Sequence, residues 1–268
     1  MIPLIKWEFK QRRLSSIFWA LGTSFYVLLV DSVFKSFVNS QTVNFARTVQ
    51  NLPSTVKSFI SVTDSFNTPA GFLSSEPYYV VLPIIFIVMA ISLGGSLLAS
   101  EESSGTLELI LSRPVSRGRL LAGKALSGLG LLLAVDIAAA AAMTLFTTLF
   151  RIHIAIKLIW EMHLMLLLLA LVFGSLAFAI TAVGRAGRSA ALGITMLLAI
   201  GGYVLTSLEG AIHWLVWPAK LLPYHYYQPS QILNGTFTVW PAICFSVITI
   251  ALIILAFISF RRRDLAGS

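Results

Sequence analysis

The sequence predicts an all-α integral membrane protein with six transmembrane helices. Composition is the first observation behind this prediction: 57% of the 268 residues are hydrophobic and 11% are charged, and the mean hydropathy is +0.87. A soluble domain has roughly 45–50% apolar and about 25% charged residues, so a water-soluble fold is excluded. The second observation is that six apolar runs reach the roughly 20 residues that a helix needs to cross the hydrocarbon core.

The six predicted spans belong to one membrane domain, residues 1–268, with no soluble domain attached. They cover 17–34, 79–100, 125–149, 164–183, 190–208 and 240–260. Two long outer connections remain, at 35–78 and 209–239. The first is expected to carry a short helix over 55–62. In the second, prolines interrupt the apolar stretches, which favours short helices supported by protein contacts.

The segment 1–16 is expected to hold an amphipathic helix that lies at the inner membrane interface. Ile5, Trp7 and Phe9 supply apolar anchors, and the neighbouring basic residues face lipid headgroups. A solvated basic tail is the alternative interpretation of this segment.

Basic residues predict the orientation, because Lys and Arg are enriched in cytoplasmic loops. Thirteen of the 19 Lys and Arg residues fall on one side of the spans, and we expect that side to be cytoplasmic. They are Lys6, Lys10, Arg12, Arg13, Arg113, Arg117, Arg119, Lys124, Arg185, Arg188, Arg261, Arg262 and Arg263. Both termini are then cytoplasmic. The net charge of +8 belongs to this face and fits anionic lipid headgroups, not a nucleic acid.

Residues 101–124 form the most informative cytoplasmic loop. Gly105 can end the helix that leaves the second span, and Pro114 stops the next helical stretch. Between them, two helical turns place Leu107, Ile110 and Leu111 on one face, and Ser116 is expected to cap the following helix. Such a helix can insert into a groove on a soluble partner, or its apolar face can rest on the bilayer.

The same loop carries a longer motif: Glu101-Glu102-x-x-Gly105-Thr106-Leu107-Glu108-Leu109-x-Leu111-Ser112-Arg113-Pro114-Val115-Ser116-Arg117. This motif closely resembles the cytoplasmic loop of ABC-2-type transporter permeases, six-span subunits that pair with a separate ATPase. The resemblance extends to the basic segment before the first span and to phrases at 51–53, 68–73 and 223–229. It therefore covers nearly the whole chain, although the cytoplasmic loop is its distinctive part.

The resemblance implies a coupling helix that docks on the ATPase. The residues it assigns to coupling are Glu101, Glu102, Gly105, Thr106, Leu107, Glu108, Leu109, Ile110, Leu111, Arg113 and Pro114. It also implies two copies of a cytoplasmic ABC ATPase, a second permease copy, re-entrant helices within 209–239 and export as the direction of transport.

A second motif in this region looks like a nucleotide site but lacks its required parts. Gly118-x-x-x-x-Gly123-Lys124-Ala125 approaches the phosphate-binding Walker A pattern. Its last position is Ala125 where a Ser or Thr would bind Mg²⁺, and no strand precedes the first glycine. We therefore expect no cofactor and no ATP hydrolysis in this chain, with ATP and Mg²⁺ bound by the partner.

Two aspartates are predicted to lie within spans. Asp136 is near the middle of the third span, where an ionisable group costs at least about 2.5–3.5 kcal/mol, so it should face the bundle interior or a water-filled path. It is either a polar residue of the translocation path or a hydrogen-bonded packing residue. Asp31 lies four residues before Lys35, a spacing that favours a structural ion pair.

The sequence gives little support for a metal site or a disulfide bond. Cys244 is the one cysteine, which excludes an intrachain disulfide. The four histidines are expected on the outer side as interfacial polar residues, because none has paired zinc-ligand spacing. They are His153, His163, His213 and His225.

These observations predict the permease subunit of an ABC exporter, in a prokaryotic plasma membrane. An ion-coupled secondary transporter that uses Asp136 is the first alternative, and an intramembrane enzyme acting on lipid is the second. The pathway walls are rich in Leu, Phe, Ala and Ser, which fits peptide, drug, lipid, polysaccharide and ion substrates alike.

Overall fold

The structure, a computed structural model, describes residues 2–39, 51–59, 61, 68–103, 105, 116–184 and 188–262. Within these ranges every regular element is helical, and there is no strand. The prediction of an all-α fold is confirmed.

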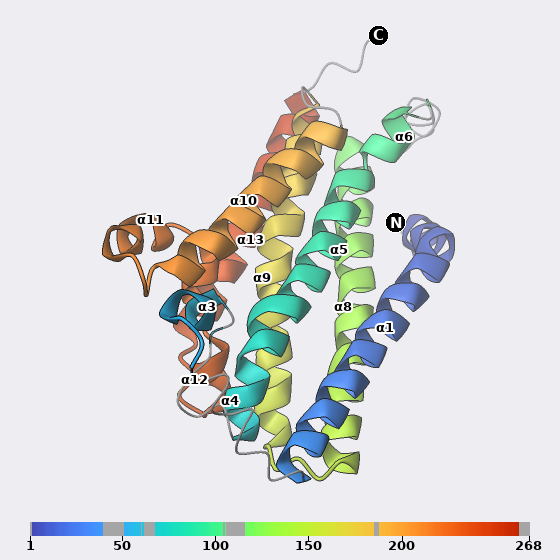
Figure 1. Cartoon of the computed structure of the whole chain (residues 1–268). Coiled ribbons are helices and arrows are strands. Elements are labelled where there is room, and N and C mark those ends of the chain that lie inside the picture. The colour runs from blue at the N-terminus through green and yellow to red at the C-terminus, as the bar shows by residue number, and fades with distance from the viewer. Residues whose placement is uncertain are drawn as a thin grey trace.

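Six described helical stretches are long and apolar enough to cross a membrane. Their main helices are α1 (Ile2–Asn39), α5 (Leu82–Ser96), α8 (Arg117–Leu149), α9 (Ile156–Val183), α10 (Arg188–Leu208) and α13 (Trp240–Arg262). Successive helices alternate in direction, as Figure 1 shows. The beginning of α1 and the end of α13 therefore lie toward the same end of the bundle, which also carries the short helix α6 (Ala99–Ser103). We call this the α6 end.

Four of the long helices, α1, α8, α9 and α10, begin earlier than the apolar runs predict. α1 is continuous from Ile2, so the expected interfacial segment and the first span form one helix, and Figure 1 shows its first turns directed away from the axis of the rest. α9 begins at Ile156, eight residues before its predicted start at 164. The added turns contain polar residues that bond inside the bundle, which a count of apolar residues cannot detect.

The second span has a break near its beginning. It consists of α4 (Pro69–Ser74), a π-helical stretch η1 (Glu76–Val81) and α5. Proline lacks a backbone N–H, and the prolines at 77 and 83 fall within the first two positions of η1 and α5. The outer loop predicted at 35–78 is correspondingly shorter, since helices extend into it from both sides.

The remaining elements are the short helices α3 (Ser54–Phe59), η2 (His213–Leu215), α11 (Val216–Ala219), η3 (Pro223–Tyr226) and α12 (Pro229–Leu233). Figure 1 shows α11 beside α10 at mid-height and α12 toward the end opposite α6, which we call the α12 end. The short helices predicted within 209–239 are thus present, and α3 coincides with most of the helix predicted at 55–62. The Tyr203 hydroxyl of α10 donates to the Phe59 carbonyl at 2.5 Å and ties α3 to the bundle.

Helix α9 is the centre of the bundle, in contact with α5, α8, α10 and α13. Its closest neighbour is α5, because Gly94 and Gly174 face each other where the two helices cross. A Cβ built on Gly94 would overlap the Gly174 carbonyl oxygen. Glycines at such positions let helix backbones approach closely in a membrane, where dispersion contacts hold helices together.

We predict that Gly94→Ala destabilises the bundle by about 1–3 kcal/mol, the usual cost of overpacking. Gly201→Ala on α10 is the matched control, since a Cβ there would meet nothing within 4 Å. That control should be neutral or stabilise by up to about 1 kcal/mol, through the better helix propensity of alanine. Thermal unfolding of both variants in lipid nanodiscs checks this, and an equal melting temperature for both would contradict the proposed crossing.

Candidate functional site

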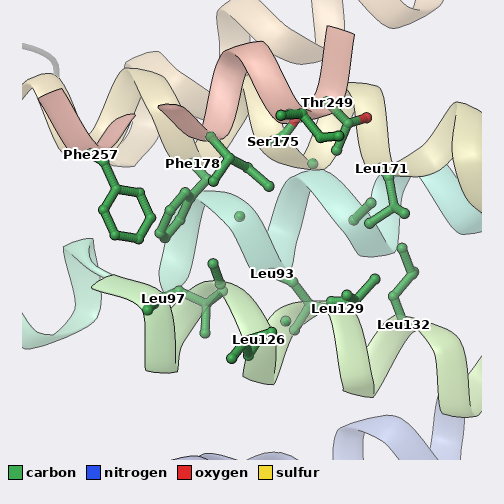
Figure 2. Close-up of a pocket in the computed structure, with 18 residues that line it drawn as sticks. Leu93, Leu97, Leu126, Leu129, Leu132, Leu171, Ser175, Phe178, Thr249 and Phe257 are labelled. Atoms are coloured by element: carbon green, nitrogen blue, oxygen red, sulfur yellow. The ribbon is translucent and has the colours of Figure 1, made fainter. Parts of the chain in front are cut away.

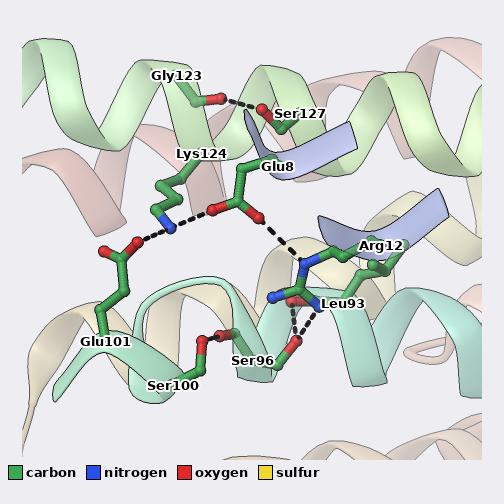
Figure 3. Close-up of polar contacts among 9 residues, drawn as sticks. All are labelled: Glu8, Arg12, Leu93, Ser96, Ser100, Glu101, Gly123, Lys124 and Ser127. Carbon is green, nitrogen blue, oxygen red and sulfur yellow. Dashed lines mark hydrogen bonds and ion pairs between the residues drawn. The ribbon is translucent and has the colours of Figure 1, made fainter. Parts of the chain in front are cut away.

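A cluster of buried charges lies at the α6 end. The ammonium group of Lys124, on α8, forms ion pairs with Glu8 of α1 and with Glu101 of α6. All three side chains are at most 5% exposed, and Figure 3 shows Lys124 between the two carboxylates. One cation therefore connects three segments that are far apart in the sequence.

Arg12 adds a fourth member and connects the cluster to α5. Its Nε donates to Glu8 Oε2 at 3.1 Å, and its Nη1 donates to Ser96 Oγ at 2.8 Å. Ser96 is the last residue of α5. We call Glu8, Arg12, Glu101 and Lys124 the charge clamp.

The sequence around Glu8 explains why α1 can approach α8 closely. Leu4 lies one turn before Glu8 and packs against Gly123, whereas Phe9 packs against Gly130. A Cβ at either glycine would meet these side chains. The glycines of α8 thus form a flat surface for α1, and Glu8 reaches Lys124 from this surface.

The clamp is electrically balanced, since two carboxylates face one ammonium and one guanidinium. Isolated buried ions cost several kcal/mol each, and the cost is recovered only where every charge has a partner. Lys124 also lies over the Trp7 ring at 5.5 Å, a cation–π contact. Its ammonium is therefore surrounded by two anions and an aromatic face.

The clamp brackets the predicted coupling loop. On one side of the loop, α6 ends at Ser103 and Gly105 adopts φ +67°, a left-handed conformation that suits glycine. On the other side, Ser116 Oγ accepts a hydrogen bond from the Arg119 N–H at 3.3 Å and caps α8. Both local predictions, the helix break and the cap, are confirmed.

Of the predicted coupling residues, the structure describes Glu101, Glu102 and Gly105. Thr106 to Pro114, which include the other eight, lie outside the described residues. Glu101 is part of the clamp, whereas sequence reasoning did not predict the role of Glu8 and treated Lys124 as a cytoplasmic cation and as part of a false Walker motif. A usable signal was present in the sequence: Glu8 is the sole acid in a basic segment and stands four residues before Arg12.

The predicted path residue Asp136 is hydrogen-bonded inside the bundle. Its Oδ1 lies 2.9 Å from His163 Nδ1 of α9, and Asp136 and His163 are 5% and 1% exposed. Of the two predicted roles of Asp136, this geometry agrees with that of a hydrogen-bonded residue in helix packing. The placement of His163 at an interface was wrong, because its bond to a residue 27 positions earlier draws the ring into the core.

The Asp31–Lys35 ion pair is also wrong. Asp31 is fully buried, and neither carboxylate oxygen has a hydrogen-bond partner among the described residues. The reason is the helical period: Asp31 lies on the face of α1 that buries Val27 and Phe34, whereas Lys35 is partly exposed.

An apolar cavity of about 450 Å³ lies between α5, α8, α9 and α13. Leu93, Leu126, Leu132 and Phe178 are among its walls, as Figure 2 shows. None of the described residues that line it is charged. The cavity can hold apolar matter by shape, but its walls offer no acid, base or metal ligand. Across the described part of the chain, no group of three or more His, Cys, Asp or Glu side chains could hold a metal ion.

We predict that Lys124→Met destabilises the protein by about 3–5 kcal/mol, because it leaves the buried Glu101 carboxylate without its counter-charge and Glu8 with Arg12 alone. Lys157→Met is the control, since Lys157 is 83% exposed and pairs with Glu161 at 3.5 Å; its effect should stay within about 0.5 kcal/mol. Adding Glu101→Gln to Lys124→Met keeps the Glu8–Arg12 pair and should recover part of the stability. Thermal unfolding measures all three variants, and no recovery in the double variant would assign the loss to packing and not to charge.

Comparison with known proteins extends these observations to the whole chain. Residues 2–265 match the family model described as ABC-2 family transporter protein. Among curated proteins, none matches the sequence. The family model covers nearly the whole chain, and the six apolar helices are those of a membrane permease. The chain therefore belongs to the ABC-2 transporter family, as the membrane component of an ABC transporter that pairs with a separate ATPase subunit.

Proposed function

We propose that this chain forms the substrate pathway of an ATP-driven exporter, as a homodimer or together with a similar permease. Two copies of the ATPase bind at the α6 end, which faces the cytoplasm of a prokaryotic cell together with both termini. ATP is hydrolysed by the partner, and this chain converts the closure of the ATPases into a change of the pathway.

The charge clamp is the observation that carries this proposal. The coupling loop has two stems, α6 and the first turns of α8, and the clamp holds a residue from each of them: Glu101 and Lys124. Glu8 attaches the beginning of α1 to the same point. A displacement of the loop by a docked ATPase would therefore move the two stems and the beginning of α1 together.

Two loop stems and the beginning of α1 that move together are suited to a switch between two arrangements of a permease dimer. ATP binding can shift that equilibrium only if the ATPase contacts differ between the two arrangements, and those contacts must be transmitted through a stiff connection. Buried ion pairs on three helical segments provide stiffness where a loop alone would not.

The ion-coupled alternative rests on Asp136, and the structure gives that residue a hydrogen-bonding partner in His163. If the alternative held, Asp136→Asn would abolish transport, and ATP depletion at a clamped ion gradient would have little effect. Under our proposal, ATP depletion stops transport.

We predict that Leu107→Asp combined with Ile110→Asp reduces ATPase capture and ATP-dependent transport at least tenfold. Two charges on the apolar face of the coupling helix would have to be desolvated on docking. The assay purifies the tagged full-length chain from its native membranes and measures vanadate-sensitive ATP hydrolysis in the eluate.

Val56→Asp is the control, because Val56 is 41% exposed on α3, which Figure 1 shows far from α6 and the proposed docking surface. It should leave capture unchanged. Capture and transport that persist in the Leu107→Asp, Ile110→Asp chain would show that the coupling assignment is wrong.

A further inference from the structure

A second buried polar cluster lies far from the charge clamp along α1. Asp31 stands 23 residues after Glu8 on this helix, which is about 35 Å of helix measured along its axis, at 1.5 Å per residue. Around it lie Tyr78 of η1, Asp136 of α8 and His163 of α9, each at most 5% exposed. The Tyr78 and His163 rings meet edge to face, with centroids 5.6 Å apart, and the carboxyl groups of Asp31 and Asp136 both lie near the Tyr78 hydroxyl.

This acid cluster contains an unusual number of polar atoms without hydrogen-bond partners. Within the described chain they are both carboxylate oxygens of Asp31, the Tyr78 hydroxyl and Nε2 of His163. Buried polar atoms are nearly always hydrogen-bonded in native structures, so each exception needs a physical reason. These atoms belong to three different segments, α1, η1 and α9, so a distortion of one helix alone does not explain them.

The charges of the cluster are also incomplete. Asp136 is stabilised by His163, whose Nδ1 lies 2.9 Å from its carboxylate. Asp31 has no such partner, and the described residues place no cation within ion-pair distance of it. An ionised carboxylate without partners in a low-dielectric interior is far more costly than the neutral acid. An ionised Asp31 would therefore need one more positive charge beside it to be neutralised.

We propose that the acid cluster is a proton-binding site in which Asp31 holds the proton. Asp31 is 0% exposed and His163 is 1% exposed, so the site is closed to a hydrated ion or an ammonium ligand. The described residues also form no group that could hold a metal ion. A proton occupies no volume and neutralises Asp31 where it stands.

The surroundings of Asp31 keep this proton inside the bundle. Tyr227, just after η3, donates its hydroxyl to the Tyr78 carbonyl oxygen at 2.8 Å and closes the cluster from the α12 end. Burial raises the pKa of Tyr227, so its hydroxyl stays neutral and remains a donor. The titratable side chains that form the cluster with Asp31 are Tyr78, Asp136, His163 and Tyr227, and Lys35 follows Asp31 by one turn on α1. Release of the proton requires α1 to move away from η1 and admit water.

Infrared difference spectroscopy on the full-length chain in lipid nanodiscs tests the proposal. At neutral pH, the spectrum of the parent minus Asp31→Asn should show the C=O stretch of a protonated carboxylic acid. Glu161→Gln is the matched control, because Glu161 is a partly exposed, ion-paired carboxylate of α9 and should contribute no such band. A parent spectrum in which Asp31→Asn removes only an ionised carboxylate band would overturn the proposal.

Stability against pH gives an independent readout. In the unfolded chain an aspartate loses its proton above about pH 3.9; if the folded chain retains it, folding binds a proton and stability falls as pH rises. Asparagine has no such proton to lose. The melting temperature of Asp31→Asn relative to the parent should therefore increase by at least about 2 °C between about pH 4 and about pH 8. A constant difference, a decrease, or a variant that does not fold would each contradict a neutral Asp31.

Discussion

The attraction between the Lys124 ammonium and two buried carboxylates is the constraint on which the α6 end depends. Glu8 and Glu101 both precede Lys124 in the sequence, by 116 and 23 residues. A buried charge that loses its partner is strongly destabilising. None of the three segments can therefore move away alone without leaving a buried ion unpaired or exposing it to water. The apolar contacts of α1 with α8 and the geometry of the loop stems follow from this requirement.

Buried charged residues of α1 lie at two depths, at Glu8 and at Asp31. Each charge of the clamp has a partner of opposite sign, beside the proposed docking surface, whereas Asp31 in the acid cluster has none among the described residues. Helix α9 joins the two levels, since it carries His163 and also packs tightly on α5 through Gly174. A movement imposed at the stems would therefore reach the acid cluster through rigid helices, with α1 as the element shared by both.

The sequence is sufficient for the features that depend on local rules. Apolar length predicts the six spans, and residue type predicts the helix break at Gly105 and the cap at Ser116. Contacts between distant segments are beyond such rules, which is why the partners of Lys124 and Asp136 were not predicted. The Asp31–Lys35 pair failed for a related reason: spacing shows which side chains can meet, whereas the packing of α1 decides which face is buried.

The central claim is that the charge clamp makes the beginning of α1 and the stem of α8 move as one body during the ATP cycle. Spin labels at Lys10→Cys and Arg119→Cys, both exposed positions, test it in a Cys244→Ser background, because Cys244 is the one native cysteine. The distance distribution between the labels is measured by pulsed electron spin resonance in the permease–ATPase complex, without nucleotide and after trapping with ATP and vanadate. The account predicts one narrow distribution that trapping leaves unchanged. A shift or a second population after trapping would show that α1 separates from α8, and would contradict it.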